Sequence, residues 1–270
     1  MVARSLALHL CSFLIAYGVA AAVADPTPME TLRATGSCPR CDLRLSEARG
    51  LRFDRADLRG AVLREADFKE AILAGADLRD ADLRRGEFER VDLTGADLTD
   101  ASMRGVDLEK AVLNGATFVE TDLRDSDLGE AQISDADFTK ADLRGATMVR
   151  ASGTRAVFRS AKMDGIDFER ANLMEADFSE SRLMLADFDR VRAVGAKFRR
   201  ADLSGVRLSS ADLTGADLTE ANLTNALLRR TRLAGADLTD VKGLTATRII
   251  DACGDESTRL PPGITLKPCD

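Results

Sequence analysis

The sequence predicts an all-β solenoid, a β-helix in which the chain turns a corner every five residues. Every phenylalanine beyond residue 50 falls in one five-residue register, and leucine fills most of the other positions of that register between residues 53 and 238. A small residue, usually alanine, stands two positions before each large one. Two sets recur every 20 residues: Phe118, Phe138, Phe158, Phe178 and Phe198, and Arg64, Arg84, Arg104, Arg124 and Arg144.

A period of five suits neither a helix nor a straight strand. Five residues advance an α-helix by about 500°, so the leucines would spread around it. In a straight strand, successive leucines would alternate between the two faces. In a unit such as Ala56-Asp57-Leu58-Arg59-Gly60, the first and third residues can instead point inward, the second outward, and the last two make the corner, where glycine tolerates positive φ. Right-angled corners give four units per coil and about nine to ten coils at a spacing of about 4.8 Å.

The units also carry a family resemblance. Ala171-Asn172-Leu173, Ala201-Asp202-Leu203 and Ala221-Asn222-Leu223 resemble the pentapeptide-repeat proteins, and the pattern extends over residues 53–240. The resemblance implies a right-handed quadrilateral β-helix, whereas the period alone does not determine handedness. The flanking segments at residues 35–43 and 252–263 resemble those that bracket the repeats in some exported bacterial members.

Residues 1–24 are predicted to be a cleavable signal peptide. Arg4 precedes an apolar run that ends at Val23, and Ala22-Val23-Ala24 before Asp25 is a small-x-small cleavage site. Cleavage between Ala24 and Asp25 would leave no stable membrane span, since no second apolar run follows. We therefore expect a periplasmic or secreted protein.

Two caps are expected at the ends of the rod, because a solenoid otherwise exposes unpaired strand edges. Residues 25–52 are assigned to an N-terminal cap with the first irregular repeats, and residues 241–270 to a C-terminal cap. Within the latter, Thr245 is expected to cap a short helix that runs through Ile249, Ile250 and Ala252.

Four cysteines, Cys38, Cys41, Cys253 and Cys269, lie outside the regular units and would remain after cleavage. An even number in an exported protein favours disulfides, with Cys38 joined to Cys41 and Cys253 to Cys269. Cys38-Pro39-Arg40-Cys41 also has the spacing of a thioredoxin-type pair, so a thiol-disulfide redox accessory is an alternative function. No strand-helix-strand pattern surrounds this motif, which favours a structural role.

The composition argues against an enzyme. The only histidine is His9 and the only tyrosine is Tyr17, both in the predicted signal peptide, and the chain has no tryptophan. A serine or cysteine nucleophile would lack a histidine base, and a zinc or iron site would lack an imidazole ligand. We therefore predict no catalytic residue, no cofactor, no metal site and no small-molecule substrate.

The charge pattern argues against nucleic acid as a partner. The formal net charge is −7, and the acidic residues fall mostly in the outward second position of each unit. The family resemblance implies one precedent, an acidic rod that mimics DNA and binds a topoisomerase. Here the columns alternate in sign, because Asp80, Asp100 and Glu120 form one edge and the arginines from Arg64 to Arg144 lie on the next wall. A DNA mimic is therefore the third reading, behind a structural or protein-interaction scaffold and the redox accessory.

One wall is the least charged of the four. It is poor in lysine and glutamate, as interface cores tend to be. We predict that it binds a partner protein or a second copy through the outward residues Ile72, Val112, Asn114, Gln132, Asn172, Met174 and Val194. The same wall holds the two small centres, Gly153 and Ala193, where we expect slack packing.

Overall fold

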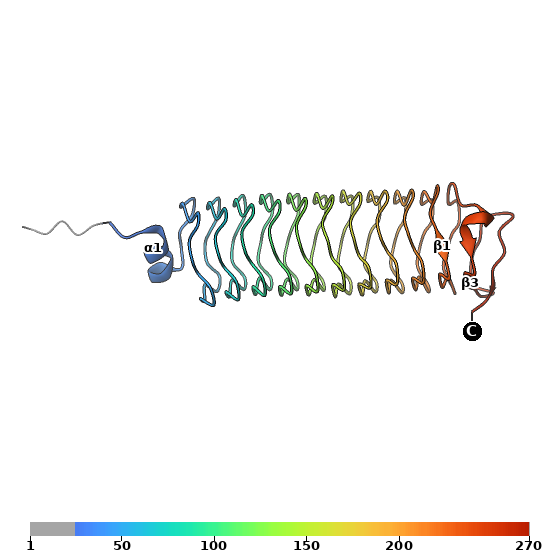
Figure 1. Cartoon of the computed structure of the whole chain (residues 1–270), viewed down its shortest axis with the longest axis horizontal. Coiled ribbons are helices and arrows are strands. Elements are labelled where there is room, and N and C mark those ends of the chain that lie inside the picture. The colour runs from blue at the N-terminus through green and yellow to red at the C-terminus, as the bar shows by residue number, and fades with distance from the viewer. Residues whose placement is uncertain (1–24, 270) are drawn as a thin grey trace, which may run out of the picture.

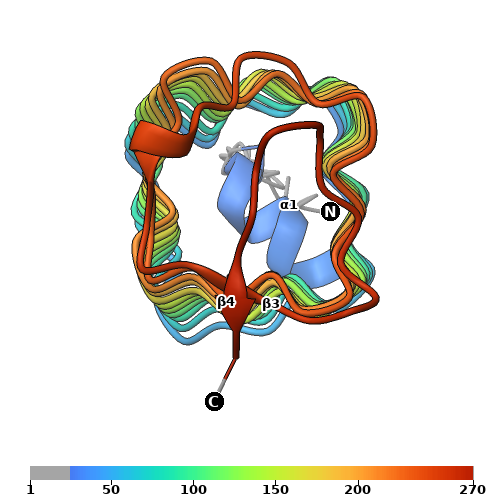
Figure 2. The same ribbon diagram turned by 90° about the vertical axis from the view of Figure 1, so that its right-hand side faces the viewer.

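Parallel bridges between residues 20 positions apart hold the coils together. The structure, a computed structural model, describes residues 25–269. The bridges begin with Ser37 and Asp57 and continue, one in each unit, to Asn222 and Lys242. Stacking of the coils produces one straight rod (Figure 1), and its end view has a roughly square outline (Figure 2).

Each unit makes the same few hydrogen bonds. The amide of Leu58 donates to the carbonyl of Asp77 at 2.8 Å, and the amide of Asp77 donates to Ala56 at 2.9 Å. The corner is closed by the amide of Ala61, which donates to Leu58 at 3.0 Å. The fifth residue has positive φ, as expected, but many units place a residue other than glycine there, for example Asp80 with φ 58°.

The large third residues fill the interior of the rod. Phe118, Phe138, Phe158 and Phe178 stack with ring centroids 4.7 to 5.0 Å apart and planes within 6° of parallel. Phe168 meets Phe158 edge-on from the opposite wall, two units further along the chain, at 5.7 Å. These rings are fully buried, which confirms the predicted phenylalanine column.

The prediction of slack packing is wrong at Gly153. A Cβ atom added there would lie 2.8 Å from Cγ1 of Ile133 and 3.1 Å from Cδ2 of Leu173. The side chains of the coils on either side have therefore closed the space that a leucine would fill. Ala193, the second small centre, is fully buried.

A helix covers the first coil. Helix α1 (Pro28–Thr35) begins with a capping box in which Thr27 and Glu30 bond each other's backbone amides, and it ends at Gly36 with φ 68°. Leu32 is its one buried residue. This helix was not predicted from the sequence, although Thr27, Pro28 and Glu30 form a recognisable helix start.

The opposite end is closed by short strands. Strand β1 (Leu228–Arg229) pairs in parallel with β2 (Ile249–Ile250), and β3 (Cys253–Gly254) pairs in parallel with β4 (Lys267–Pro268). The helix expected after Thr245 is wrong. A 3-10 turn, η1 (Ala246–Arg248), forms instead, and Thr245 makes no side-chain cap. The two β-branched isoleucines favour the extended conformation in which they pair with β1.

The predicted signal peptide lies outside the described residues, and Asp25 is the first residue described. Between residues 25 and 269, no helix has the length and apolar character needed to cross a bilayer.

Candidate interaction surfaces

The bridges align the residues of the predicted contact surface. Ile72, Val112, Gln132 and Asn172 occupy the second position of their units and fall in one ladder along the rod. Met174 follows in the fourth position, two residues after Asn172, and Asn114 and Val194 occupy the fourth position of other coils. We call these seven residues the neutral wall: Ile72, Val112, Asn114, Gln132, Asn172, Met174 and Val194.

The neutral wall is partly apolar, and the side chain of Asn114 is bonded to the backbone of the next coil. Val112, Met174 and Val194 are half-buried, and Gln132 is exposed. Oδ1 of Asn114 accepts the amide of Ser134 at 3.0 Å. Oδ1 of Asn172 is different, because it is buried and has no hydrogen-bond partner in the described part of the chain. An unpaired buried oxygen is unfavourable by about 1–3 kcal/mol.

Charged residues of the same ladder interrupt the neutral wall. Asp92 lies between Ile72 and Val112, and Arg192 follows Asn172. The carboxylate of Asp92 accepts the amide of Thr94 at 2.9 Å. The most continuous uncharged stretch therefore lies in the middle of the rod, between Val112 and Asn172.

On the other walls, opposite charges meet at close range. Arg124 and Asp122 approach to 2.6 Å, and so do Arg79 and Asp77. The hydrogen bond from Arg124 lowers the pKa of Asp122, which is half-buried. Because each arginine column is matched by carboxylates of its own chain, these walls carry no continuous field of one sign. Exposed pairs of this kind contribute little stability individually.

One acidic stretch, which was not predicted from the sequence, is compensated only in part. Glu89 lies 3.6 Å from Lys69 and Glu109 lies 2.5 Å from Lys110. Burial raises the pKa of Asp107, and the carboxylates of Glu89, Asp127 and Glu109 raise it further. The amide of Glu109 donates to Asp107 at 3.0 Å. Among residues 25–269, no three His, Cys, Asp or Glu side chains are grouped so as to hold a metal ion.

The cysteines lie at the two ends of the rod. The structure joins Cys253 to Cys269, with Cα atoms 4.8 Å apart, and Cys38 to Cys41, with Cα atoms 5.5 Å apart. Cys38 is buried, and its Sγ atom is 3.5 Å from the carbonyl oxygen of Pro28 at the start of α1. A redox partner would therefore have poor access to this sulfur atom.

A family model described as "Pentapeptide repeats" matches the chain in eight copies. The matched residues are 46–85, 61–100, 92–129, 118–152, 131–170, 154–190 and 207–242. No curated protein matches the chain.

Several solved structures are similar. HetL, a pentapeptide repeat protein involved in heterocyst differentiation regulation in the cyanobacterium Nostoc sp. strain PCC 7120, is 30% identical over 84% of this chain and 94% of its own, with a TM-score of 0.35. Full-length QnrB1, a plasmid-mediated fluoroquinolone resistance protein, is 18% identical over 82% and 94%, with a TM-score of 0.34. A pentapeptide repeat protein from the Arabidopsis thaliana thylakoid lumen is 29% identical over 42% and 69%, with a TM-score of 0.23.

Proposed function

The chain belongs to the pentapeptide-repeat family, whose members fold as right-handed β-helices, and we propose that it is an exported, non-enzymatic scaffold that binds another protein. The observation that carries this proposal is the alignment of the neutral wall in one ladder. It offers a flat surface of small polar and aliphatic side chains on a rigid support. Tyr and Trp, common at interface hot spots, are absent beyond residue 17, so binding would depend on the extent of this surface.

We infer a quadrilateral helix of about nine to ten coils, with an N-terminal cap and the first irregular repeats in residues 25–52 and a C-terminal cap in residues 241–270. The 20-residue bridges and the outline in Figure 2 support this architecture. The alternatives have less support. Burial of Cys38 disfavours a redox accessory, and the pairing of arginines with carboxylates disfavours a DNA mimic.

Export rests on the signal-like composition before Asp25. We expect the mass of the protein recovered from the periplasm or the medium to correspond to a chain that starts at Asp25. A mass that still includes Met1 in exported material would contradict cleavage at this site.

The contact surface is tested by a matched pair of valine substitutions. Val112 lies on the neutral wall and Val119 on the phenylalanine wall, and both are half-buried. We expect Val112→Arg to abolish capture of the partner from a native cell-envelope extract, because it places a long cation in the middle of the surface. Val119→Arg should capture the partner as the unmodified chain does. Equal capture by both variants would exclude the neutral wall as the contact surface.

A further inference from the structure

Two of the most exposed leucines lie in the same corner of the rod. We call the fifth residues of the units at this corner the corner row. Backbone bonds between successive coils hold it in register, for example from the amide of Leu45 to Arg64 at 3.1 Å and from that of Gly165 to Met184 at 2.9 Å. Along the rod, the corner row reads Leu45, Glu65, Arg85, Gly105, Asp125, Gly145, Gly165, Leu185, Gly205 and Asn225.

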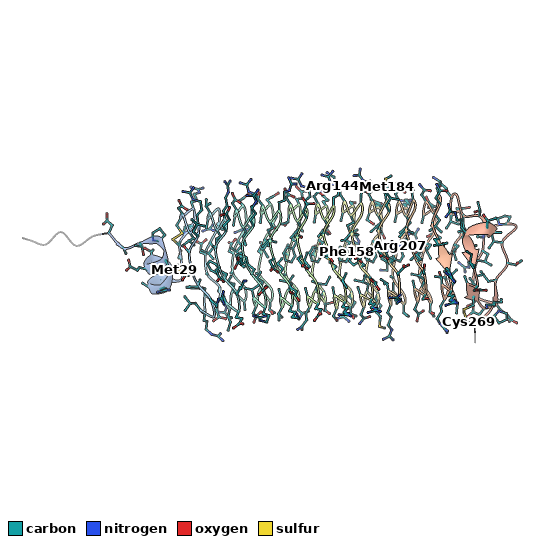
Figure 3. All side chains as sticks on the ribbon, in the orientation of Figure 1. Met29, Arg144, Phe158, Met184, Arg207 and Cys269 are labelled. Carbon is teal, nitrogen blue, oxygen red and sulfur yellow. A yellow bond between two sulfur atoms is a disulfide. The ribbon has the colours of Figure 1, made fainter. Side chains whose placement is uncertain are left out.

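Both leucines remain exposed in the fold, although the side chain of Leu185 lies over Gly205, where an added Cβ atom would be 2.8 Å from its Cδ2 atom. Leu45 is 70% exposed and Leu185 is 73% exposed. Both have φ near 60°, a conformation in which a leucine is unfavourable and glycine is preferred. Met184, beside Leu185, is also exposed and projects from the same edge of the rod as Arg144 (Figure 3). Leu185 and Met184 therefore form one exposed apolar pair, and Leu45 is a second exposed apolar residue in the same row.

The stretch of the corner row from Leu45 to Leu185 is complementary to itself when read in the opposite direction. If two copies lie antiparallel about a two-fold axis between Gly105 and Asp125, Leu45 of one faces Leu185 of the other. In the same register, Glu65 faces Gly165, Arg85 faces Gly145, and Asp125 faces Gly105. Every charged residue of this stretch therefore faces a glycine of the other copy. A leucine faces a leucine at each end, and these two contacts are about 34 Å apart at the coil spacing. No side chain or backbone atom lies within 4 Å of a Cβ atom added at Gly165.

The neighbouring fourth-position residues are compatible with this register. Arg64 would face Asp164 of the second copy, a pair of opposite charge, although Arg64 is also bound to Asp82 and Asp164 to Arg182 of their own chains. Two like-charge pairs also arise, because Arg104 would face Arg124 and Arg84 would face Arg144. Each of these arginines is already bound to an aspartate of its own chain, at 2.6 to 2.9 Å. A parallel arrangement would instead place Glu65, Arg85 and Asp125 against their own copies, and like charges in contact disfavour association.

We propose that the corner row mediates antiparallel self-association. The contact follows a two-fold axis, so each copy contributes the same surface. A contact along one corner buries a small area compared with most specific interfaces. We therefore expect the dimer to be reversible and to depend on concentration. The neutral wall takes no part in it, so its role in binding a partner is tested separately by Val112→Arg.

Sedimentation of the purified chain over a range of concentrations tests the proposal. We expect the unmodified protein to shift from monomer to dimer as its concentration rises. Leu185→Asp and Leu45→Lys should each weaken the dimer at least tenfold. Combining the two substitutions should restore dimerisation, because the introduced charges face each other only in the antiparallel register.

Ile250→Asp is the control, because Ile250 is also an exposed apolar residue, at 43%, but lies in the C-terminal cap. It should leave the dimer unchanged. A monomer at all concentrations, equal effects of Leu185→Asp and Ile250→Asp, or failure of the double substitution to recover the dimer would each overturn the proposal. Melting temperatures of all variants establish that they fold.

Discussion

At the scale of single residues, the outward carboxylates serve the corners. In many units, an aspartate in the second position accepts the amide two residues later, as Asp97 does from Thr99 at 3.0 Å and Asp217 from Thr219 at 3.0 Å. This local bond satisfies an amide at the corner and explains the preference for aspartate and asparagine. The sequence predicts this role, since the second position must point outward. It does not predict where carboxylates of successive coils crowd together, as they do around Asp107.

The crowding around Asp107 predicts a pH-dependent effect. Its pKa is raised in the folded protein, so its ionised form destabilises the fold above that pKa, and the effect disappears below the ordinary aspartate pKa of about 3.9. Asp107→Asn should therefore stabilise the protein at pH 7 and have no effect near pH 3. Urea unfolding at both pH values measures this.

Asp122→Asn is the matched control for Asp107→Asn. The pKa of Asp122 is lowered by Arg124, so its carboxylate stabilises the fold above the ordinary aspartate pKa, and this stabilisation is lost as the pH falls through the lowered value. We expect Asp122→Asn to destabilise the protein at pH 7. Effects of the same sign for the two variants would contradict this explanation.

At the scale of elements, the phenylalanine column is the best example of a feature that the sequence predicts. A spacing of 20 residues places the rings in register, and the structure stacks them. The closure of the space at Gly153 could not be predicted in this way, because it depends on how Ile133 and Leu173 of adjacent coils turn their side chains. Periodicity gives the position of a residue but not the rotamers around it.

Truncation of the central ring should be costly. Phe158 stacks between Phe138 at 5.0 Å and Phe178 at 4.9 Å, so Phe158→Ala leaves a cavity and should reduce the free energy of unfolding by about 3–5 kcal/mol. Phe53→Ala is the control, because Phe53 is near the end and its ring lies 6.2 Å from that of Phe68. Urea denaturation should give a smaller loss for Phe53→Ala. Equal losses would mean that stacking adds nothing.

The caps are elements that the sequence predicts less well. The N-terminal helix has a readable start, whereas at the other end the pairing of Ile249 and Ile250 with β1 takes the place of the expected helix. That pairing joins segments about one coil apart in sequence. The pairing with β1 therefore overrides the local helix preference after Thr245, and no local sequence pattern reveals that pairing.

The C-terminal cap should depend on its cysteines. We expect no free thiol in the exported protein, and Cys269→Ser should lower the free energy of unfolding by about 3 kcal/mol, because the closed loop spans 16 residues. Cys41→Ser removes a disulfide between residues only three positions apart, so it should lower the free energy of unfolding by less. Thiol titration and urea unfolding measure both effects. Four titratable thiols in the folded protein would contradict the disulfide assignment.

At the scale of the whole molecule, the residues that hold the rod together differ from the residues that form its outer surfaces. The third-position side chains and the bridges between coils account for the fold, so the outward residues can vary without changing it. For this reason the sequence predicts the architecture in detail but only indicates where partners bind. The neutral wall and the corner row face different directions, and one rod could therefore bind a second copy and another protein at once.

The most direct test of the scaffold is photo-crosslinking in the native cell, with a photoreactive residue in place of Val112, Gln132 or Val119. Illumination should produce one discrete protein adduct from positions 112 and 132, which lie in successive coils of the neutral wall. Position 119, on another wall, should give none. Adducts of equal yield from all three positions, or from position 119 alone, would contradict the central claim that this chain acts by binding a protein along its neutral wall.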